Sequence, residues 1–291
     1  MNHIVLICGR SGCGKSTIIQ NIQNMVEHPD QYLDAFDKSD PSGIADMLET
    51  KHVRFPKIYT TRPKRPNESD KEYYFVSEEE FESKRTQMIH VSEYNTTAGI
   101  WKYGTVMDYE EWFGENQNDA VILPINLDGY FQINENIKKW NAEQPFKKRI
   151  SVHLLYIFAT SEDLLIRSIK RELAKPKEKQ DFAEILRRYQ TETDVNHHTE
   201  GVDFNAFYYA DMFEKVLDNI FMLEDMTELS IGNDIFANMV RKSTNMFYEK
   251  FGVKNHDDGK RFHFFHSIND KQDVLSVNIL KTILELDQIE K

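Results

Sequence analysis

The sequence predicts an α/β fold in which a central parallel sheet is flanked by helices. Three observations lead to this prediction. Residues 3–8 form a short apolar run bounded by glycine, and apolar residues then recur at helical spacing over 16–25. A longer β-rich run, RISVHLLYIFAT, suits a buried central strand. Strands that alternate with helices leave loops at the carboxyl ends of the strands, where we expect the functional site.

Length, composition and charge set limits on the protein. Its 291 residues, of which 40% are hydrophobic, are enough for a substantial core. The net charge of -12 argues against a general nucleic-acid-binding surface, and no apolar run approaches the roughly 20 residues of a membrane-spanning helix. We therefore expect a cytoplasmic protein with neither nucleic acid nor a membrane as a partner, and its oligomeric state stays open. Cys8 and Cys13 flank a tight loop and are expected to be reduced thiols.

The predicted elements follow in order along the chain. Residues 27–55 are polar and rich in breakers around a short helix expected at 44–50, and we interpret them as an insertion. Ser77 and Glu80 have the spacing of a capping box, which predicts that a helix begins there. A strand is expected at 120–125, and a helix follows the long apolar run.

The chain changes character after about Asp225. We predict one domain over 1–225 and an appended extension over 226–291, whose role the sequence does not reveal. Within this extension, the aromatic run FHFFHSI and a final helix of apolar periodicity are expected to cover the core. A dimer face is the alternative interpretation of the same residues.

The stretch ICGRSGCGKST has the spacing of a phosphate-binding loop. Its glycines allow backbone NH groups to point at phosphate oxygens at the start of a helix, and the flanking strand and helix are the context that this motif requires. Lys15 would neutralise the β and γ phosphates of ATP, and the Ser16 hydroxyl would bind Mg²⁺. The predicted ATP-binding residues are Gly9, Arg10, Ser11, Gly12, Cys13, Gly14, Lys15, Ser16 and Thr17.

Two arginines in YTTRPKRPNESDKEYYF are candidates for binding a second phosphate. Pro63 and Pro66 hold Arg62 and Arg65 in a stiff, extended segment, so that their guanidinium groups are partly pre-organised to grip a phosphate. Tyr73 would add a hydroxyl. A solvated basic loop is the alternative interpretation of this segment.

This second segment resembles guanylate kinases. The family pattern T-T-R-x-x-R-x-x-E, Y-x-F-V-S and E-F is matched by Thr60, Thr61, Arg62, Arg65, Glu68, Tyr73, Phe75, Val76, Ser77, Glu80 and Phe81. The resemblance covers about 2–220 without the insertion. It implies a P-loop kinase fold with a small acceptor-binding subdomain near 58–107 and a helical lid near 161–192. It also implies Mg²⁺-dependent phosphoryl transfer from ATP to a nucleoside monophosphate, GMP or dGMP.

The resemblance also implies roles for single residues. WKYGT resembles the family element that places Tyr103 and Thr105 in the acceptor site, and Glu93 resembles the base-reading glutamate after a shift of one residue. A carboxylate accepts hydrogen bonds from N1-H and the 2-amino group of guanine and finds no such pair on adenine, so Glu93 would favour guanine. An ordinary solvated glutamate is the alternative. The catalytic cations would be Lys15 and the lid arginines Arg167, Arg171 and Arg188.

The sequence departs from the family pattern in three places. A strand end that reads L-D-I-D in the family has Pro124 and Asn126 in place of its aspartates. We keep Asn126 as an acceptor-binding residue, while Mg²⁺ then depends on Ser16, phosphates and water. Ile58 replaces a serine of the base site, and Tyr209 stands where an asparagine of the donor side is expected.

These departures leave two alternatives to a guanylate kinase. One is a kinase for a different or modified nucleoside monophosphate. The other is a non-catalytic module of similar fold that binds phosphorylated partner peptides. The retained Gly14, Lys15 and Ser16 argue against the module, because it would not need an intact phosphate loop.

Overall fold

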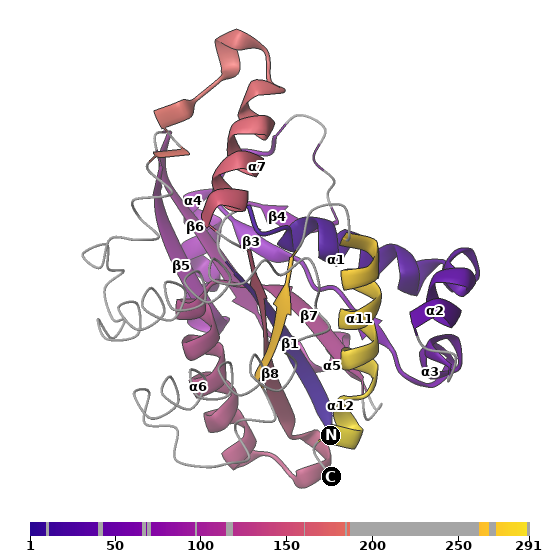
Figure 1. Ribbon diagram of the computed structural model, residues 1–291. Helices are drawn as coiled ribbons and strands as arrows, with labels where there is room; N and C mark the ends of the chain where they lie inside the picture. The colour runs from indigo at the N-terminus through magenta and orange to yellow at the C-terminus, as the bar shows by residue number, and fades with distance from the viewer. Residues whose placement is uncertain are drawn as a thin grey trace.

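The computed structural model describes residues 1–9, 12–39, 43–65, 68, 71–96, 98–114, 119–159, 161–183, 185–186, 262–267 and 272–289. These residues form two sheets with helices around them (Figure 1). No helix in these ranges combines the length and the apolar composition needed to cross a membrane.

The larger sheet has five parallel strands within the described residues (Figure 1). They are β1 (Asn2–Cys8), β2 (Val53–Arg54), β7 (Ala120–Pro124), β8 (Ile150–Phe158) and β9 (Phe262–His266). Their order across the sheet is β2-β7-β1-β8-β9, with β1 at the centre, and every neighbouring pair is parallel. Parallel strands end at the same edge of a sheet, so the segments that follow β1, β7 and β8 lie near one another.

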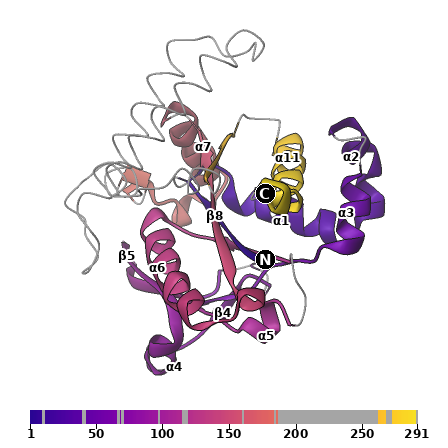
Figure 2. The ribbon, with the colours of Figure 1, turned by 90° about the horizontal axis from the view of Figure 1, so that it is seen from below.

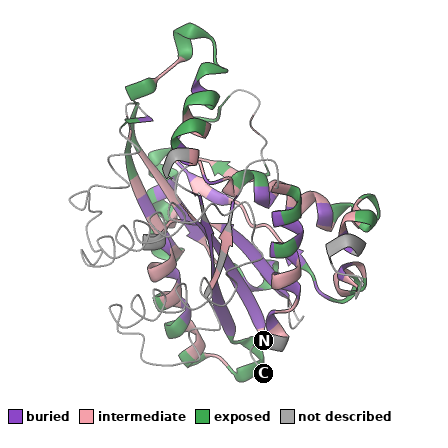
Figure 3. Ribbon diagram, viewed as in Figure 1, coloured by how far each residue is buried: buried purple, intermediate pink, exposed green. Residues whose placement is uncertain are grey.

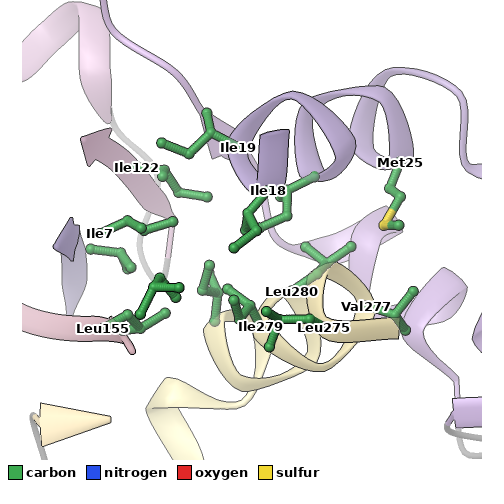
Figure 4. Packing of buried hydrophobic residues seen from close by; sticks show 14 of the residues in the cluster. Ile7, Ile18, Ile19, Met25, Ile122, Leu155, Leu275, Val277, Ile279 and Leu280 are labelled. Carbon is green, nitrogen blue, oxygen red and sulfur yellow. The ribbon is translucent and has the colours of Figure 1, made fainter. Parts of the chain in front are cut away.

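One face of this sheet packs against α1 (Lys15–Glu27) and α11 (Gln272–Leu284). Alternation along β1 points Val5 and Ile7 into this core. Helices α2 (Leu33–Ser39) and α3 (Ile44–Thr50) extend the same layer, and the 3-10 turn η1 (Pro29–Tyr32) joins α1 to α2. Figure 4 shows how these side chains pack, with labels on Ile7, Ile18, Ile19, Met25, Ile122, Leu155, Leu275, Val277, Ile279 and Leu280.

The opposite face packs against the short helix α5 (Tyr109–Trp112) and α6 (Leu127–Glu143). Ile4 and Leu6 of β1 point this way and form a second core with apolar residues of both helices. Seen from below, α1 and α11 lie on one side of the sheet and α5 and α6 on the other (Figure 2). The 3-10 turn η3 (Phe146–Lys148) leads from α6 into β8. The predicted α/β class, with a parallel sheet between helices, is confirmed.

The smaller sheet has four strands in the order β4-β3-β6-β5. Its strands are β3 (Ile58–Thr60), β4 (Tyr73–Phe75), β5 (Met88–Thr96) and β6 (Gly99–Val106), and β5 and β6 form an antiparallel hairpin. Helix α4 (Glu78–Lys84) and the 3-10 turn η2 (Arg85–Gln87) precede β5. As predicted, Ser77 caps α4, since its Oγ accepts a hydrogen bond from the Glu80 amide at 3.1 Å.

Helix α7 (Ser161–Leu173) follows β8 and leads to the short 3-10 turn η4 (Lys177–Lys179). It covers part of the lid expected at 161–192, whose residues beyond 186 lie outside the described part of the chain. Much of the α7 surface is exposed, whereas β1, β7 and β8 of the larger sheet are largely buried (Figure 3).

The residues interpreted as an insertion take part in the larger sheet. Helix α3 has the predicted bounds, 44–50, and β2 pairs with β7 at the edge of the sheet. Lys51 ties this segment to α11 and to α12 (Leu286–Ile289). Its Nζ donates to Leu284 O at 3.3 Å and to Asp287 Oδ2 at 3.2 Å. This part of the chain therefore packs as one layer with the C-terminal helices.

The expectation of an appended extension after about Asp225 needs correcting. Strand β9 pairs with β8 as a member of the larger sheet, and α11 packs into the core of that sheet. These residues cover the core, as expected, but they belong to the same folded unit as β1. The change of character along the sequence hid a pairing between strands that are distant in the chain. The predicted boundary at 225 lies outside the described residues and stays a prediction.

Candidate functional site

The connection from β1 to α1 is the stretch predicted as a phosphate loop. Its glycines have left-handed backbone angles, with φ of 149° at Gly9, 89° at Gly12 and 101° at Gly14. A Cβ atom at Gly9 would also lie 2.3 Å from Ile157 O of β8. The loop therefore needs glycine both for its conformation and for space. It ends at the N-terminus of a helix of 13 residues, where an anion binds favourably.

Lys15 begins α1 with its ammonium group folded back over the loop. Its Nζ donates to Gly9 O and lies 3.9 Å from the Sγ of the buried Cys13. Ser16 and Thr17 are exposed next to it. The cation and the two hydroxyl residues expected to meet the triphosphate are therefore at one end of α1.

Arg167 is the predicted lid arginine that the structure brings to this loop. From α7, its Nη1 donates to Cys13 O at 3.3 Å and to Ser267 Oγ at 3.1 Å, and its Nη2 donates to Ser267 O at 2.8 Å. The guanidinium thereby links the loop to the residue that follows β9. One turn further along α7, Arg171 is exposed. Three predicted site residues lie outside the described part of the chain: Arg10, Ser11 and Arg188.

Sequence reasoning missed two residues beside the loop, Ser267 and Gln272. Gln272 Nε2 donates to Ser267 Oγ at 2.7 Å, and a Cβ atom at Gly14 would lie 2.9 Å from Gln272 Oε1. Both residues reach the loop because β9 joins the sheet next to β8. That pairing leaves no local signal in the sequence, so a motif search has no means of finding them.

Arg62, on the smaller sheet, is buried and fixed by Glu68. Its Nη1 donates to Glu68 Oε2 at 2.8 Å, and its Nη2 donates to Glu68 Oε1. The guanidinium also lies over the ring of Tyr73, 4.9 Å from the centroid. The hydrogen bond from Arg62 lowers the pKa of the Glu68 carboxyl, and burial raises the pKa of the Tyr73 hydroxyl to about 12. At neutral pH, Glu68 is therefore charged and Tyr73 is a neutral hydrogen-bond donor.

Arg65 is an exposed residue whose backbone is also held by Glu68. Its amide donates to Glu68 Oε2 at 3.0 Å, and the Glu68 amide donates back to Arg65 O at 3.2 Å. One carboxylate thus orients the side chain of Arg62 and the main chain of Arg65. The alternative of a solvated basic loop does not describe Arg62, which is only 6% exposed.

Glu93 does not lie with the other residues predicted to bind the acceptor. In the β5–β6 hairpin, Ser92 pairs with Tyr103 and Glu93 pairs with Lys102, and successive strand residues point to opposite faces. Glu93 Oε1 accepts from Arg85 Nη2 at 3.2 Å on the face toward α4. This corrects the guanine-reading role expected for Glu93: the shift of one residue in its alignment moved its side chain to the wrong face.

The opposite face of the smaller sheet carries Tyr73, Tyr94 and Tyr103, and we call it the tyrosine face. Tyr103 is 6.1 Å from Tyr73 and 5.4 Å from Tyr94 between ring centroids. Thr105, also predicted at the acceptor, is buried on this face opposite its partner His90. Sequence reasoning missed His90, Ser92 and Tyr94 on this face. The available signal is strand alternation: Ser92 pairs with Tyr103, and residues two positions away from Ser92 point to the same side.

Asn126 reaches the tyrosine face from the start of α6. Its Oδ1 accepts from the Gly129 amide at 2.8 Å, and its Nδ2 donates to the Tyr94 hydroxyl at 2.8 Å. An amide caps a helix as well as a carboxylate does, so the replacement of aspartate keeps the cap and removes the charge. Two further departures lie elsewhere: Pro124 is at the end of β7 opposite Ile7, and Ile58 of β3 is buried in the second core.

Comparison with known proteins finds guanylate kinases. The chain is 30% identical over 131 residues to that of Thermotoga maritima, 40% over 92 residues to that of Symbiobacterium thermophilum, and 28% over 204 residues to that of Latilactobacillus sakei. These matches cover 45%, 31% and 69% of this chain. They cover 50%, 41% and 78% of the relatives, so the chain spans half the length, or less, of the first two. Over the matched residues, the chain is therefore similar to guanylate kinases.

Two further comparisons complete this picture. The crystal structure of guanylate kinase from Anaplasma phagocytophilum is similar over 87% of this chain and 97% of its own, with 16% identity and a TM-score of 0.37. No family model matches the sequence.

Tyr209, which stands where the donor-side asparagine is expected, lies outside the described part of the chain, and this expectation stays a prediction.

Proposed function

We propose that this chain transfers the γ-phosphoryl group of ATP to a nucleoside monophosphate, with GMP or dGMP as the acceptor expected from its similarity to guanylate kinases. One observation carries the proposal: the molecule has two separate arrangements suited to phosphate. A glycine loop at a helix N-terminus carries Lys15 and contacts Arg167. The smaller sheet presents the buried Arg62 beside Tyr73. Such a pair of sites suits a triphosphate donor and a monophosphate acceptor.

The reaction needs positioning and charge more than covalent help from the protein. The acceptor is itself a phosphate anion, so no general base is required, and the task is to bring two phosphates into line. Lys15 would bind the β and γ phosphates, and Arg167 would balance the charge of the moving group from α7. Arg62 and Tyr73 would hold the acceptor phosphate, with Glu68 fixing the guanidinium.

The remaining predicted residues keep supporting roles in this proposal. Thr105 and Tyr103 would line the acceptor site from β6, and Asn126 would close it from α6. Cations for the closed state would come from Arg65 on the acceptor side and from Arg171 and Arg188 in the lid. The glycines of the loop, with Arg10, Ser11, Cys13 and Thr17, would surround the phosphates of ATP.

Mg²⁺ fits this site as a partner of ATP. Ser16 is exposed at the start of α1, and a hydroxyl oxygen is a ligand that Mg²⁺ accepts. Asn126 is neutral, and its Oδ1 already caps α6, so it brings no charge to the metal. Among the described residues, no cluster of three or more His, Cys, Asp or Glu side chains offers another metal site. Ser16, the phosphates and water would hold the ion, whose positive charge neutralises the phosphates when it is bound.

Phosphoryl transfer from Mg-ATP to GMP, dGMP, AMP, CMP and UMP tests the proposal. We expect turnover with GMP or dGMP and its loss in Lys15→Ala. The matched control is Lys148→Ala, because Lys148 is an exposed lysine that pairs with Glu110 at 3.1 Å. Turnover of other acceptors without GMP or dGMP would favour a kinase for a different or modified nucleotide. A chain that phosphorylates none of them and binds no ATP would be a binding module instead.

A further inference from the structure

The tyrosine face offers the base of an acceptor nucleotide a surface without charged side chains from the β5–β6 hairpin. β5 places His90, Ser92 and Tyr94 on this face, and β6 adds Tyr103 and Thr105 across the hairpin. Burial lowers the pKa of His90 to about 4, so its imidazole is neutral at pH 7. The other four residues are hydroxyl-bearing types that carry no charge at this pH.

The charged residues at the centre of this hairpin point the other way. Glu93 pairs with Arg85, and their side chains are 37% and 42% exposed. Lys102, opposite Glu93, donates to Glu82 Oε1 at 2.6 Å. A shift of one residue in β5 would bring Glu93 to the tyrosine face, but it would also turn the buried His90 to the other side. The carboxylate of Glu93 is therefore kept away from the tyrosine face.

Tyr94, Tyr103 and Asn126 are the members of this neutral group that reach the surface. His90, Ser92 and Thr105 are each 4% exposed or less, so they lie behind the surface. Tyr94 is 38% exposed, and Tyr103 and Asn126 are partly exposed. A ligand on this face would therefore meet the phenol rings of Tyr94 and Tyr103 and the carboxamide of Asn126 before any other side chain of the group.

Hydrogen bonds fix the orientation of Tyr94 and Asn126. Asn126 Oδ1 accepts from the Gly129 amide at 2.8 Å, which turns Nδ2 toward the Tyr94 hydroxyl, also at 2.8 Å. Behind them, His90 Nε2 and Ser92 Oγ are 2.7 Å apart, and Ser92 Oγ is 3.4 Å from Asn126 Oδ1. The buried residues thus hold this pair in place.

A row of aromatic rings connects this pair to the arginine proposed to bind phosphate. The Arg62 guanidinium lies over Tyr73, which meets Tyr103 edge to face. Tyr103 in turn meets Tyr94 edge to face, with centroids 5.4 Å apart and an interplanar angle of 86°. A nucleotide whose phosphate is held by Arg62 therefore has its base directed along this row toward Tyr94.

We propose that Tyr94 and Asn126 contact the acceptor base, and that this site selects its base only weakly. The inference rests on the proposed function. Stacking on an aromatic ring tolerates every base, because each base has a π face. A site built on a buried hydrogen-bonding group rejects the wrong partner by about 10⁴–10⁵, whereas sites without one discriminate by roughly 10–200-fold. We expect kcat/KM for GMP, AMP, CMP and UMP to lie within about 100-fold of one another.

Kinetics of single variants test the inference. Tyr94→Ala should raise the KM of each accepted monophosphate at least about tenfold and leave the KM of ATP within about twofold. Tyr94→Phe keeps the ring and should raise the acceptor KM less than about threefold. Asn126→Ser keeps a capping side chain, removes the amide donor and should raise the acceptor KM about threefold. Glu93→Gln, the control on the opposite face, should change no ratio of kcat/KM by more than about twofold.

Two results would overturn the inference. One is a GMP preference of about 10⁴ or more that Glu93→Gln abolishes, since a carboxylate would then read the base. The other is an unchanged acceptor KM in Tyr94→Ala. Calorimetric binding of GMP and AMP separates this inference from the proposed function. Tyr94-dependent binding without turnover would refute only the kinase, and turnover with Tyr94-independent binding would refute only the inference. A wild-type chain that binds neither nucleotide would refute both.

Discussion

The phosphate loop and the tyrosine face differ in how the chain gathers their residues. The loop is one continuous stretch from Gly9 to Lys15 between a strand and a helix, and glycine backbone angles set its shape. The tyrosine face is assembled from β4, β5, β6 and the start of α6, and strand pairing decides which side chains reach it. A local motif therefore determines which groups line the loop, whereas a register change of one residue would replace the side chains on the tyrosine face with those of the opposite face.

The two regions also differ in charge. Lys15 and Arg167 bring positive charges to the loop, where they donate hydrogen bonds to the carbonyl oxygens of Gly9 and Cys13. The tyrosine face buries neutral side chains and keeps its one buried cation, Arg62, paired with Glu68. Changes at the loop should therefore act on the rate of transfer, and changes at the face should act on acceptor binding and on stability.

The largest expected effect is at the loop. Lys15→Ala should lower kcat/KM about 10³-fold or more, about 4 kcal/mol, because the charge on the transferring phosphoryl group loses a cation. A coupled assay of ADP release measures it, with Lys148→Ala expected within about twofold of wild type. If Lys15→Ala kept a tenth of the wild-type activity, the loss of a charge at the loop would have no larger effect than the tenfold change expected for Glu68→Gln at the acceptor side.

A pH effect should single out the tyrosine face. Burial lowers the pKa of His90 from 6.5 to about 4, so the unfolded chain binds a proton first as the pH falls. The stability due to neutral His90 is complete above about pH 6.5 and is lost toward pH 4, by about 3 kcal/mol for the full shift.

Urea unfolding at pH 7 and pH 4.5 measures this loss in wild type and in His90→Gln. The variant should lose about 2 kcal/mol less between the two pH values, because it has no imidazole to protonate there. His263, whose pKa burial also lowers to about 4, acts with the same sign and is present in both proteins. Equal losses in the two proteins would show that His90 does not hold the face in a neutral state.

A smaller effect should come from the residue that positions Arg62. Glu68→Gln should raise the KM of the acceptor about tenfold, about 1.4 kcal/mol, and leave the KM of ATP within about twofold, because the guanidinium loses a charged partner. Glu82→Gln is the control, since Glu82 is 41% exposed and pairs with Lys102 away from the tyrosine face. An acceptor KM that stays the same in Glu68→Gln would mean that packing against Tyr73 suffices to place Arg62.

The smallest effect is expected behind the tyrosine face. Arg85→Ala removes the exposed pair with Glu93 and should change the free energy of unfolding by less than about 0.5 kcal/mol, with no change in acceptor KM. Chemical denaturation and the coupled assay measure the two quantities. A tenfold rise in acceptor KM would indicate that Glu93 acts at the acceptor site after all, and the two faces of the sheet would then not differ as described.

The sequence was sufficient to predict elements whose signal lies within a few neighbouring residues. The helix at 44–50 and the Ser77 cap follow from capping and breaker residues within a few positions. Glu93 was assigned to the wrong face because side chains alternate between the two faces of a strand. A register shift in β5 between Met88 and His90 interrupts this alternation, so counting residues along the sequence does not tell which face a side chain occupies. Ser267 and Gln272 were missed because they reach the loop through β9. Its pairing with β8 joins residues far apart in the chain, and no residue spacing in the sequence indicates it.

Strand β9 is made long after the strand with which it pairs. Residues 159–261 separate β8 from β9 in the sequence, so we expect the pairing of these two strands to carry a large chain-closure entropy and to form slowly. On the ribosome, β1 and α1 emerge well before Gln272, which lies against Gly14 of the phosphate loop, and Ser267, which Gln272 contacts. We expect the nascent chain to gain nucleotide affinity only once α11 has been synthesised, and until then the apolar residues of α1 that α11 covers stay uncovered by it.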